Sequence, residues 1–458
     1  MTLDKNITDA LAAYIIDSQQ KEFDSEVVHK FKRALMDYVC AAITGSNMPV
    51  PNSLLEYLKQ IDSSEISSVT GKSMKLSPLN AALVNGTSAH SLDFDDGHTH
   101  GSIHIGTVVF PAIFAVAEQY SSSQEEFIKA AIIGYEIAGR LSAALHPNVW
   151  KRGYHNTPVI GIFGATAAVC VLLKANKEQI LDALGHAGSF SGGLFEFLGE
   201  GADIKRIHPG KAARDAILSA ELALKGITGP KKVFEGKNGF VRAFADNNIN
   251  LERLYLGLHT EYEISKIYFK PYPCCRHLHG PIDGTLELLT LNQIDVNNID
   301  RIEVGTYKVG ANHKHKEVNH LLDAQMSIPC AVALALVYGE VSINTFEDSK
   351  VQSEQVQNLI NKVDVTADER CEESYPKHRP AIITITMKDG TEYRQYVEDP
   401  KGESNYPLTD KELEAKFVNN CLGILTKDEV DQVLNAIWTF ENLENLDVFY
   451  INSSLQTK

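Results

Sequence analysis

Acidic and imidazole side chains crowd into residues 90–104, where three aspartates and four histidines occur within fifteen residues. Both groups carry protons near neutral pH, which favours acid–base catalysis. Both are also ligands for zinc, manganese or iron, so the segment could form a metal site. A third interpretation is a solvated loop whose acids cap a helix. No His-Glu-x-x-His or similar metal signature decides between the three.

A single histidine marks the second candidate segment. His155 precedes Thr157-Pro158, which predicts a helix with a threonine N-cap and a proline at its start. The free backbone amides at such a start favour a bound anion. A histidine with a purely structural role is the alternative interpretation.

Cations concentrate in the third segment, where Lys205, Arg206 and His208 come just before Pro209. We expect Pro209 to begin a helix, so these cations would form an anion site at a helix N-terminus. A basic surface turn is the alternative. The glycine-rich run before them, residues 188–201, fits neither the P-loop nor the dinucleotide-binding pattern.

The fourth segment, residues 270–280, combines two stiffening prolines with a run of cationic and titratable side chains. These side chains include Lys270, Arg276 and His277. The adjacent Cys274 and Cys275 could indicate thiol chemistry. Because the sequence has no second pair, we interpret both as small buried residues.

The overall charge narrows what such a site could bind. The chain has 458 residues, with 43 Lys and Arg against 59 Asp and Glu, and a formal net charge of −16. A surface this acidic disfavours nucleic acid and anionic membranes as partners. Because the cations concentrate in a few segments from both predicted domains, we expect a cleft for a small polyanion, most simply a di- or tricarboxylate.

Cysteine usage and the N-terminus both indicate a cytoplasmic protein. The seven cysteines include no Cys-x-x-Cys motif and predict no disulfide framework. The first residues lack the basic and apolar regions of a signal peptide. The purest apolar run, residues 108–117, is too short to cross a bilayer of about 30 Å.

Helical patterns dominate the first part of the chain and predict what must position these side chains. Apolar residues keep a helical period over residues 27–42, Ser77-Pro78 marks a further helix start, and a capping box begins at Ser123. Few stretches alternate with period two. We therefore expect a large all-helical domain over residues 1–264.

The pattern changes after residue 264. Alternating or β-branched runs separated by turn signals, such as Asp389-Gly390, are typical of strands and hairpins. We expect strands at 301–306, 381–387 and 393–397. We expect helices at 281–291 and 327–338.

These patterns define a mainly α fold class. A smaller α+β domain over residues 265–399 is expected to be inserted into the helical domain. A helical pattern restarts at Thr409, so residues 400–458 are expected to form C-terminal helices that return to the first domain.

Five segments together resemble the MmgE/PrpD family, also called the 2-methylcitrate dehydratase family, which includes cis-aconitate decarboxylase and iminodisuccinate epimerase. The likeness covers nearly the whole chain, and the segments occur in the family's order. They are Leu92-Asp93-Phe94-Asp95-Asp96, Gly153-Tyr154-His155-Asn156-Thr157, and residues 205–213, 270–277 and 407–413.

The resemblance implies a helical domain with an inserted lid, a homodimer, an active site at the domain interface, and no metal or organic cofactor. The positions that match the family's catalytic residues are Asp93, His104, His155, Lys205 and His277. The residues expected to bind substrate carboxylates are Lys270, Arg276, Arg206 and His208.

Two positions depart from the family's pattern. Gly97 stands where many relatives have threonine, so a hydroxyl contact to substrate is missing or is supplied by Thr99. Ile105 stands where relatives often have proline. Both departures leave the choice of substrate open.

The implied activity is that of a cofactor-independent lyase acting on a small di- or tricarboxylate. Dehydration of 2-methylcitrate is the first expectation, and decarboxylation of cis-aconitate to itaconate or an iminodisuccinate-type epimerisation is the alternative. Lys205 would stabilise negative charge that develops on carbon, while His104 or His155 would donate a proton. Asp93 would accept a proton or fix a histidine tautomer.

Two alternatives come from different classes of protein. One is a metal-dependent hydrolase built on the segment between Asp93 and His104. The other is a carboxylate-binding protein that catalyses no reaction.

Overall fold

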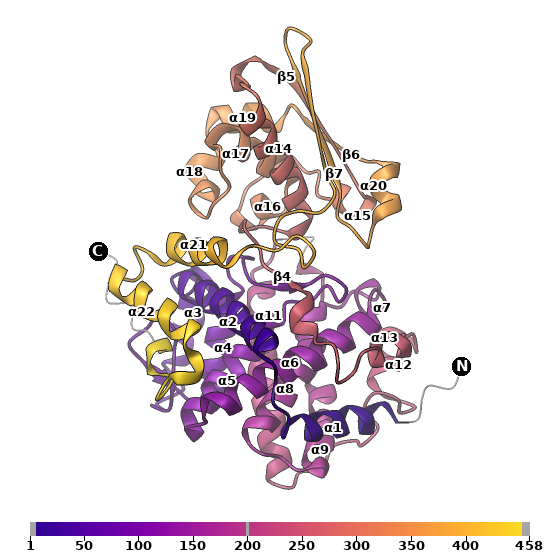
Figure 1. Ribbon diagram of the computed structural model, residues 1–458, viewed down its shortest axis with the longest axis vertical. Coiled ribbons are helices and arrows are strands. Elements are labelled where there is room, and N and C mark those ends of the chain that lie inside the picture. The colour runs from indigo at the N-terminus through magenta and orange to yellow at the C-terminus, as the bar shows by residue number, and fades with distance from the viewer. Residues whose placement is uncertain (1–5, 198–200, 451–458) are drawn as a thin grey trace. The chain divides into compact units, whose positions relative to one another are not determined.

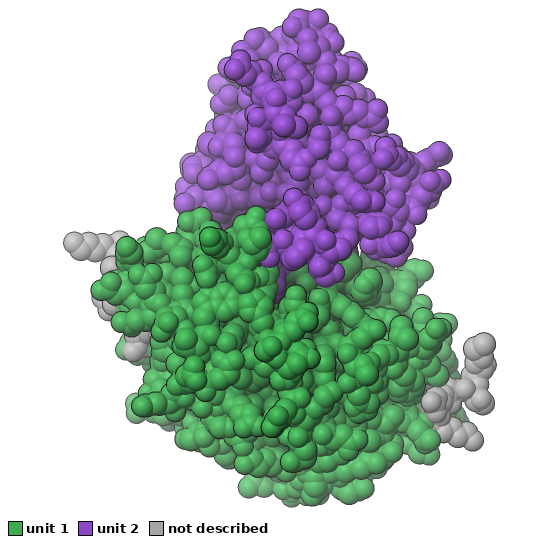
Figure 2. All heavy atoms as spheres, in the orientation of Figure 1, with its two compact units in different colours: residues 1–91, 95–268, 409–458 green, residues 92–94, 269–408 purple. Residues whose placement is uncertain are grey.

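The computed structural model describes residues 6–197 and 201–450. Gly199 and Glu200 of the glycine-rich run lie outside this described part. The chain divides into two compact units, shown in Figure 2: unit 1 comprises residues 1–91, 95–268 and 409–458, and unit 2 comprises residues 92–94 and 269–408. The boundaries expected from the sequence were 264/265 and 399/400.

Unit 1 is built almost entirely of helices (Figure 1). Its helices are α1 (Ile7–Ser18), α2 (Ser25–Gly45), α3 (Pro49–Leu58), α4 (Pro78–Ala89), α5 (Gly106–Tyr120), α6 (Gln124–Leu145), α7 (Asn148–Lys151), α8 (Asn156–Leu172), α9 (Lys177–Phe190), α11 (Ile204–Leu224), α12 (Phe240–Ala245), α13 (Leu251–Tyr255), α21 (Asp410–Cys421) and α22 (Lys427–Trp438). Two short antiparallel pairs join β1 (Ser67–Ser68) to β2 (Lys75–Leu76) and β3 (Gly97–His98) to β4 (Ile267–Tyr268).

Helix α8 forms the centre of unit 1, because every one of its residues is buried. A helix that is apolar all round must be covered on all sides, and α5, α6, α9 and α11 pack against it. Helix α4 crosses α11 so closely that a Cβ added to Gly86 would lie 2.6 Å from the Cα of Gly210. This crossing brings the end of α4 beside the first turns of α11.

The C-terminal helix α21 packs against α2 of unit 1. Lys416 of α21 lies with its Nζ 2.6 Å from Oδ1 of Asp37, and both side chains are buried. Arg33 forms a second ion pair, with Asp410. No helix in the described part of the chain has the length and apolar character that a membrane span requires.

Unit 2 contains a four-stranded sheet in the order β6-β5-β7-β8. Strand β5 (Ile299–Thr306) is parallel to β6 (Val363–Ala367) and antiparallel to β7 (Ala381–Met387), which pairs with β8 (Glu392–Val397). Its helices are α14 (His279–Leu291), α15 (Lys308–Ala311), α16 (Leu321–Gln325), α17 (Ile328–Tyr338), α18 (Asp348–Val351), α19 (Glu354–Ile360) and α20 (Glu369–Ser374). Figure 1 shows α14, α17 and α19 gathered on one side of the sheet.

The mainly α fold class expected from the sequence is confirmed. The helix start expected at Pro209 is wrong, because α11 begins at Ile204 and contains Pro209. A proline inside a helix removes one backbone hydrogen bond and crowds the carbonyl four residues earlier, and the packing of α11 offsets this cost near its start. Lys205, Arg206 and His208 therefore belong to α11 itself rather than to a turn before it.

Candidate active site

The loop between α4 and α5 is organised around the carboxylate of Asp95. Its Oδ2 accepts a hydrogen bond from Nδ1 of His90 at 2.9 Å, and Nδ1 of His104 lies 3.0 Å from the same oxygen. The backbone oxygen of Asp96 also lies 2.7 Å from Nδ1 of His104. Because these partners are acceptors, each histidine carries its proton on Nδ1, which leaves Nε2 able to exchange a proton.

His90 and Asp95 are almost completely buried, at 0% and 1% exposure. Burial lowers the pKa of His90 to about 4, although the charge of Asp95 opposes this shift. Burial raises the pKa of Asp95, but the two histidines overcome this effect and hold it well below its ordinary value. Nε2 of His90 has no hydrogen-bond partner among the described residues. A buried nitrogen of this kind marks a place where a ligand atom would be stabilised.

A second pair of histidines lies beside the first. His155 caps the start of α8, and its Nδ1 lies 3.0 Å from Nδ1 of His208 on α11. One ring must donate and the other accept, so the pair holds one proton between the two nitrogens. The ring centres of His155 and His90 are 6.2 Å apart.

The cationic side chain of Lys205 completes this cluster in unit 1. Burial, followed by the charges of His90, His208 and Lys205, holds the pKa of His155 well below its ordinary value. Burial and the neighbouring lysines also lower the pKa of His208 to about 4. The histidines are therefore neutral near pH 7, and Lys205 is buried beside them.

The next residue along the loop, Asp96, has a different role. Its Oδ1 accepts the backbone N–H of Gly106 at 3.0 Å, and its Oδ2 accepts the hydroxyl of Tyr135 at 2.6 Å. Burial, with the charge of Asp37 behind it, raises the pKa of Asp96 to about 7. These bonds fix the start of α5 and thus the end of the loop that carries His104.

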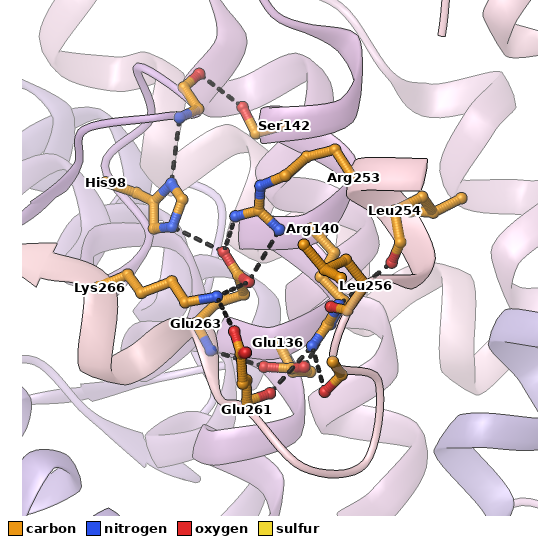
Figure 3. Close-up of polar contacts among 12 residues, drawn as sticks. His98, Glu136, Arg140, Ser142, Arg253, Leu254, Leu256, Glu261, Glu263 and Lys266 are labelled. Atoms are coloured by element: carbon orange, nitrogen blue, oxygen red, sulfur yellow. Dashed lines mark hydrogen bonds and ion pairs between the residues drawn. The ribbon is translucent and has the colours of Figure 1, made fainter. Parts of the chain in front are cut away.

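A separate network, drawn in Figure 3, anchors the middle of the same loop. Nε2 of His98 lies 2.8 Å from Oε2 of Glu263, and Nδ1 of His98 accepts the backbone N–H of Gly101 at 3.1 Å. The carbonyl of Gly101 accepts hydrogen bonds from Ser142 and Asn156. The loop is therefore tied to α6 and to the start of α8.

Glu263 is held by charge as well as by His98. Arg253 binds its carboxylate through two nitrogens, at 3.1 and 2.6 Å, and Lys266 Nζ lies 3.2 Å away. The backbone N–H of Glu263 donates to Glu136, which pairs with Arg140 (Figure 3). The exposed fraction of Glu263 is 0%, so this network is part of the core of unit 1.

The space around Gly97 explains one departure from the family's pattern. A Cβ at this position would lie 2.3 Å from the hydroxyl oxygen of Tyr268, to which Gly97 is paired in the β3–β4 ladder. Real Cβ atoms do not approach other atoms this closely. Tyr268 thus occupies the space that a threonine side chain at position 97 would need.

Unit 2 holds the other predicted site residues. Nζ of Lys270 lies 2.9 Å from Oδ1 of Asp93 and 2.8 Å from its backbone oxygen. Asp93 has a φ of 53°, in the left-handed region that aspartate adopts only occasionally. Such strained residues concentrate at functional sites because the surrounding structure must hold them.

Arg276 is held by several groups of unit 2. It donates to Glu403 at 3.0 Å, to His279 at 2.9 Å, and to two backbone oxygens, those of Lys401 and Pro400. Its expected role as a carboxylate binder stays a prediction. The contacts show that Arg276 also holds the segment 400–403 in place.

His277 lies beside Tyr307, whose hydroxyl is 2.6 Å from its Nδ1. Burial and the charges of His313 and Arg379 are the largest causes that hold its pKa well below the ordinary value. His277 is therefore a neutral imidazole near pH 7.

The structure groups the predicted residues by unit. Unit 1 brings together His104, His155, Lys205 and His208. In the same unit, Arg206 lies 3.6 Å from Asp203. Unit 2 holds Asp93, Lys270, Arg276 and His277.

Sequence reasoning missed His90 and Asp95 as individual site residues. Both stand in the polar segment already singled out, but a loop has no period that would show which of its members meet. The sequence signal that could have marked His90 is its place directly after the last residue of α4.

This arrangement is suited to moving protons next to an anion. Neutral histidines with defined tautomers can accept or donate a proton, and a buried lysine beside them stabilises negative charge. Imidazole and carboxylate groups could also hold a transition metal ion, and His90, Asp95 and His104 offer atoms within 4.8 Å of one another. In the structure, however, the Nδ1 atoms of both histidines are bonded to Asp95 itself.

Comparisons with known proteins give the family of this chain. The MmgE/PrpD N-terminal domain matches residues 9–252, and the MmgE/PrpD C-terminal domain matches residues 272–440. The chain belongs to the MmgE/PrpD family.

Similar curated proteins are lyases. The chain is 28% identical to the cis-aconitate decarboxylase-like protein oryM of Aspergillus oryzae, over 96% of this chain and 95% of the relative. It is 26% identical to human cis-aconitate decarboxylase, over 97% and 94%. It is 23% identical to 2-methylcitrate dehydratase of Escherichia coli, over 72% of each. The expectation of a lyase from this family is confirmed.

Proposed function

We propose that this lyase acts on a small di- or tricarboxylate without a cofactor and removes CO2 or water through a carbanion-like state. The observation that carries the proposal is the unit 1 cluster, where the neutral, buried His90, His155 and His208 all feel the charge of one buried lysine, Lys205. A carbanion next to a carboxylate needs a nearby positive charge and a positioned proton carrier, and the cluster supplies both.

His104 is the proposed proton carrier. Its Nδ1–H is held by Asp95 and by the backbone oxygen of Asp96, so Nε2 is the nitrogen that exchanges a proton with the substrate carbon or leaving group. Its side chain is 16% exposed, whereas that of His90 is 0% exposed. His104 therefore has the better access to a bound molecule.

Lys205 is proposed to stabilise the developing negative charge. Its charge contributes to the lowered pKa values of His90, His155 and His208, which places it close to all three imidazoles. A substrate carboxylate near Lys205 would thus also lie within reach of the histidines.

Decarboxylation of cis-aconitate is the reaction that we propose to test first. Named cis-aconitate decarboxylases align with 93–97% of this chain. Dehydration of 2-methylcitrate, expected first from the sequence, is the second candidate, because a dehydratase from Yarrowia lipolytica aligns with 89% of the chain. Both reactions need the same charge stabilisation and proton transfer.

A deuterium experiment tests the function. The purified protein is incubated in D2O with cis-aconitate, 2-methylcitrate or iminodisuccinate and followed by NMR. Release of CO2, loss of water, or deuterium uptake with an unchanged carbon skeleton would identify decarboxylase, dehydratase or epimerase respectively. Lys205→Met should abolish turnover, whereas Lys225→Met, at the exposed end of the same helix, should not. If none of these acids reacts, the proposal fails.

The catalytic role expected for His277, and that expected for Asp93, remain proposals. If Lys205 and His277 act on the same transition state, the double variant Lys205→Met/His277→Gln should lose far less than the product of the two single losses in kcat. Independent losses that multiply would remove His277 from the catalytic group.

The absence of a cofactor requirement is also a proposal. Turnover should survive incubation with a chelator and exhaustive dialysis, and elemental analysis should find no stoichiometric metal. Loss of turnover that returns on adding one metal ion would instead favour metal-assisted chemistry at the histidine cluster.

A further inference from the structure

Cys275 differs from the other six cysteines of the chain. Those six are buried, whereas Cys275 is partly exposed. The interpretation of both adjacent cysteines as buried residues is therefore correct for Cys274 and wrong for Cys275. Cys275 stands at the N-cap position of a 3-10 turn, Arg276–Leu278.

A histidine from a distant part of unit 2 faces this thiol. Nε2 of His313 lies 4.0 Å from Sγ of Cys275, and Nδ1 of His313 lies 2.9 Å from the backbone oxygen of Met326. The carbonyl can only accept, so the Nδ1 proton is fixed there. Nε2 is then the nitrogen that can take the thiol proton, which is the arrangement of a nucleophile, a base and an orienting group.

Cationic groups of unit 2 lie around His277, which is the neighbour of this pair. Lys270, Arg276 and Arg379 lie near enough to depress the pKa of His277, whose ring stacks on that of His313 at 5.2 Å between centres. The negative charge of Asp93 raises the pKa of Cys275, and Asp93 accepts a hydrogen bond from Lys270. The largest favourable contribution to the thiolate comes from His313 itself.

The titration behaviour of the pair agrees with its geometry. Burial raises the pKa of the Cys275 thiol, but the charge and hydrogen bond of His313 outweigh this effect and place it below the ordinary value. Burial lowers the pKa of His313, but Cys275 and the Met326 carbonyl raise it above its ordinary value.

We propose that Cys275 and His313 form a thiolate–imidazolium pair that makes Cys275 a modification site for soft carbon electrophiles. In the step itself, the thiolate sulfur forms a bond to the electrophilic carbon. With a haloacetamide the carbon–halogen bond breaks and halide leaves. The imidazolium keeps the proton that it took from the thiol, so no oxidant or reductant is needed.

The same side chains offer a second possibility, capture of a metal ion, because Cys275, His277 and His313 present atoms within 4.8 Å of one another. The cationic groups around them favour an anion over a divalent cation, so the observations favour the thiolate.

Alkylation kinetics test the proposal on the full chain. The protein is treated with iodoacetamide between pH 5.5 and 9, and the carboxamidomethylated Cys275 peptide is measured by mass spectrometry. As pH is raised, the alkylation rate of Cys275 should reach its plateau before pH 8. At pH 6.5 it should exceed the rate of the same cysteine in the urea-unfolded chain by about tenfold. His313→Gln, which cannot become imidazolium, should lose this advantage. His315→Gln, on the same loop, should keep it.

Three outcomes would overturn the proposal. The native rate could follow that of the unfolded chain at every pH, or His313→Gln could leave the profile unchanged. Alkylation that appears only after treatment with EDTA would show that the three side chains hold a metal ion. None of these readouts depends on turnover, so the result is independent of the proposed function.

Discussion

Unit 1 contains two clusters in which a carboxylate contacts histidine, and the two clusters differ in the other groups around the carboxylate. Asp95 holds His90 and His104, and Glu263 holds His98. Both carboxylates are at most 1% exposed, as are His90 and His98, whereas His104 is 16% exposed. Around Glu263, Arg253 and Lys266 add positive charge. The bonds described for Asp95 come from imidazoles alone.

The difference shows how to tell a structural cluster from a chemical one. Both ring nitrogens of His98 lie against protein groups: Nδ1 accepts the N–H of Gly101, and Nε2 lies 2.8 Å from Oε2 of Glu263, at ion-pair distance but without hydrogen-bond geometry. His90 uses only Nδ1, and its Nε2 is buried without a partner among the described residues. A buried imidazole nitrogen that faces a carboxylate is compensated by that charge, whereas one that faces no polar group costs stability at a place where a ligand can restore it.

The largest expected effect is on turnover. His104→Gln should reduce kcat by about 10³, because it removes the proton carrier while an amide can still bond to Asp95. Its Tm should change little. His98→Gln is the matched variant, and it should lower Tm while the folded fraction keeps kcat within about tenfold. If His98→Gln lost kcat and His104→Gln lost only Tm, the His98 cluster would be the catalytic one and the Asp95 cluster the structural one.

A smaller effect is expected on stability at the second cluster. Glu263→Gln should lower the free energy of unfolding by about 3 kcal/mol, because it leaves charges without their buried partner. Arg253 and Lys266 are partly exposed and can turn to water, which limits the loss. Urea unfolding measures the change. Glu261→Gln, at an exposed position of the same network, should have no measurable effect on stability. An equal loss of stability in that variant would contradict the stabilising role of the buried Glu263.

The smallest effect expected is a shift of protons when a ligand binds. His90 and His208 have pKa values of about 4 in the free protein. A bound polycarboxylate favours their charged forms and raises both values. Binding should therefore take up protons and weaken as pH rises through the raised values.

Calorimetry measures this proton uptake. Citrate is titrated into the protein in two buffers of different ionisation enthalpy between pH 5 and 8. Uptake should be positive in the native protein and smaller in His208→Gln. A heat that is the same in both buffers at every pH would mean that the histidines do not respond to the ligand.

Local patterns were enough to predict much of the fold. The capping box at Ser123 and the start of α4 at Pro78 are as expected, because caps and prolines act on their own helix. Strands β7 and β8 follow their alternation and the Asp389-Gly390 turn. The start of α11 was missed because Pro209 marks a helix start only on average, and packing against α4 carries the helix through it.

Site residues that lie in a recognisable motif could be predicted from the sequence. Contacts that form because an irregular loop folds back on itself could not. Residue types alone marked the segments that contain His104, His155 and Lys205, and the resemblance then gave their catalytic roles. The meeting of His90 and His104 on Asp95 depends on a turn in an irregular loop, for which spacing gives no rule. The contact between Cys275 and His313 joins residues 38 apart, and no local pattern can show it.

Gly97 and Tyr268 have a consequence for how this family changes over evolutionary time. Since a side chain at position 97 would collide with the tyrosine ring, Gly97 cannot be replaced while Tyr268 stays. Relatives with threonine at the first position should have a smaller residue at the second, so the two positions should vary together. A lineage that passes from one pairing to the other would pass through a glycine paired with a small residue, where neither side chain fills the space.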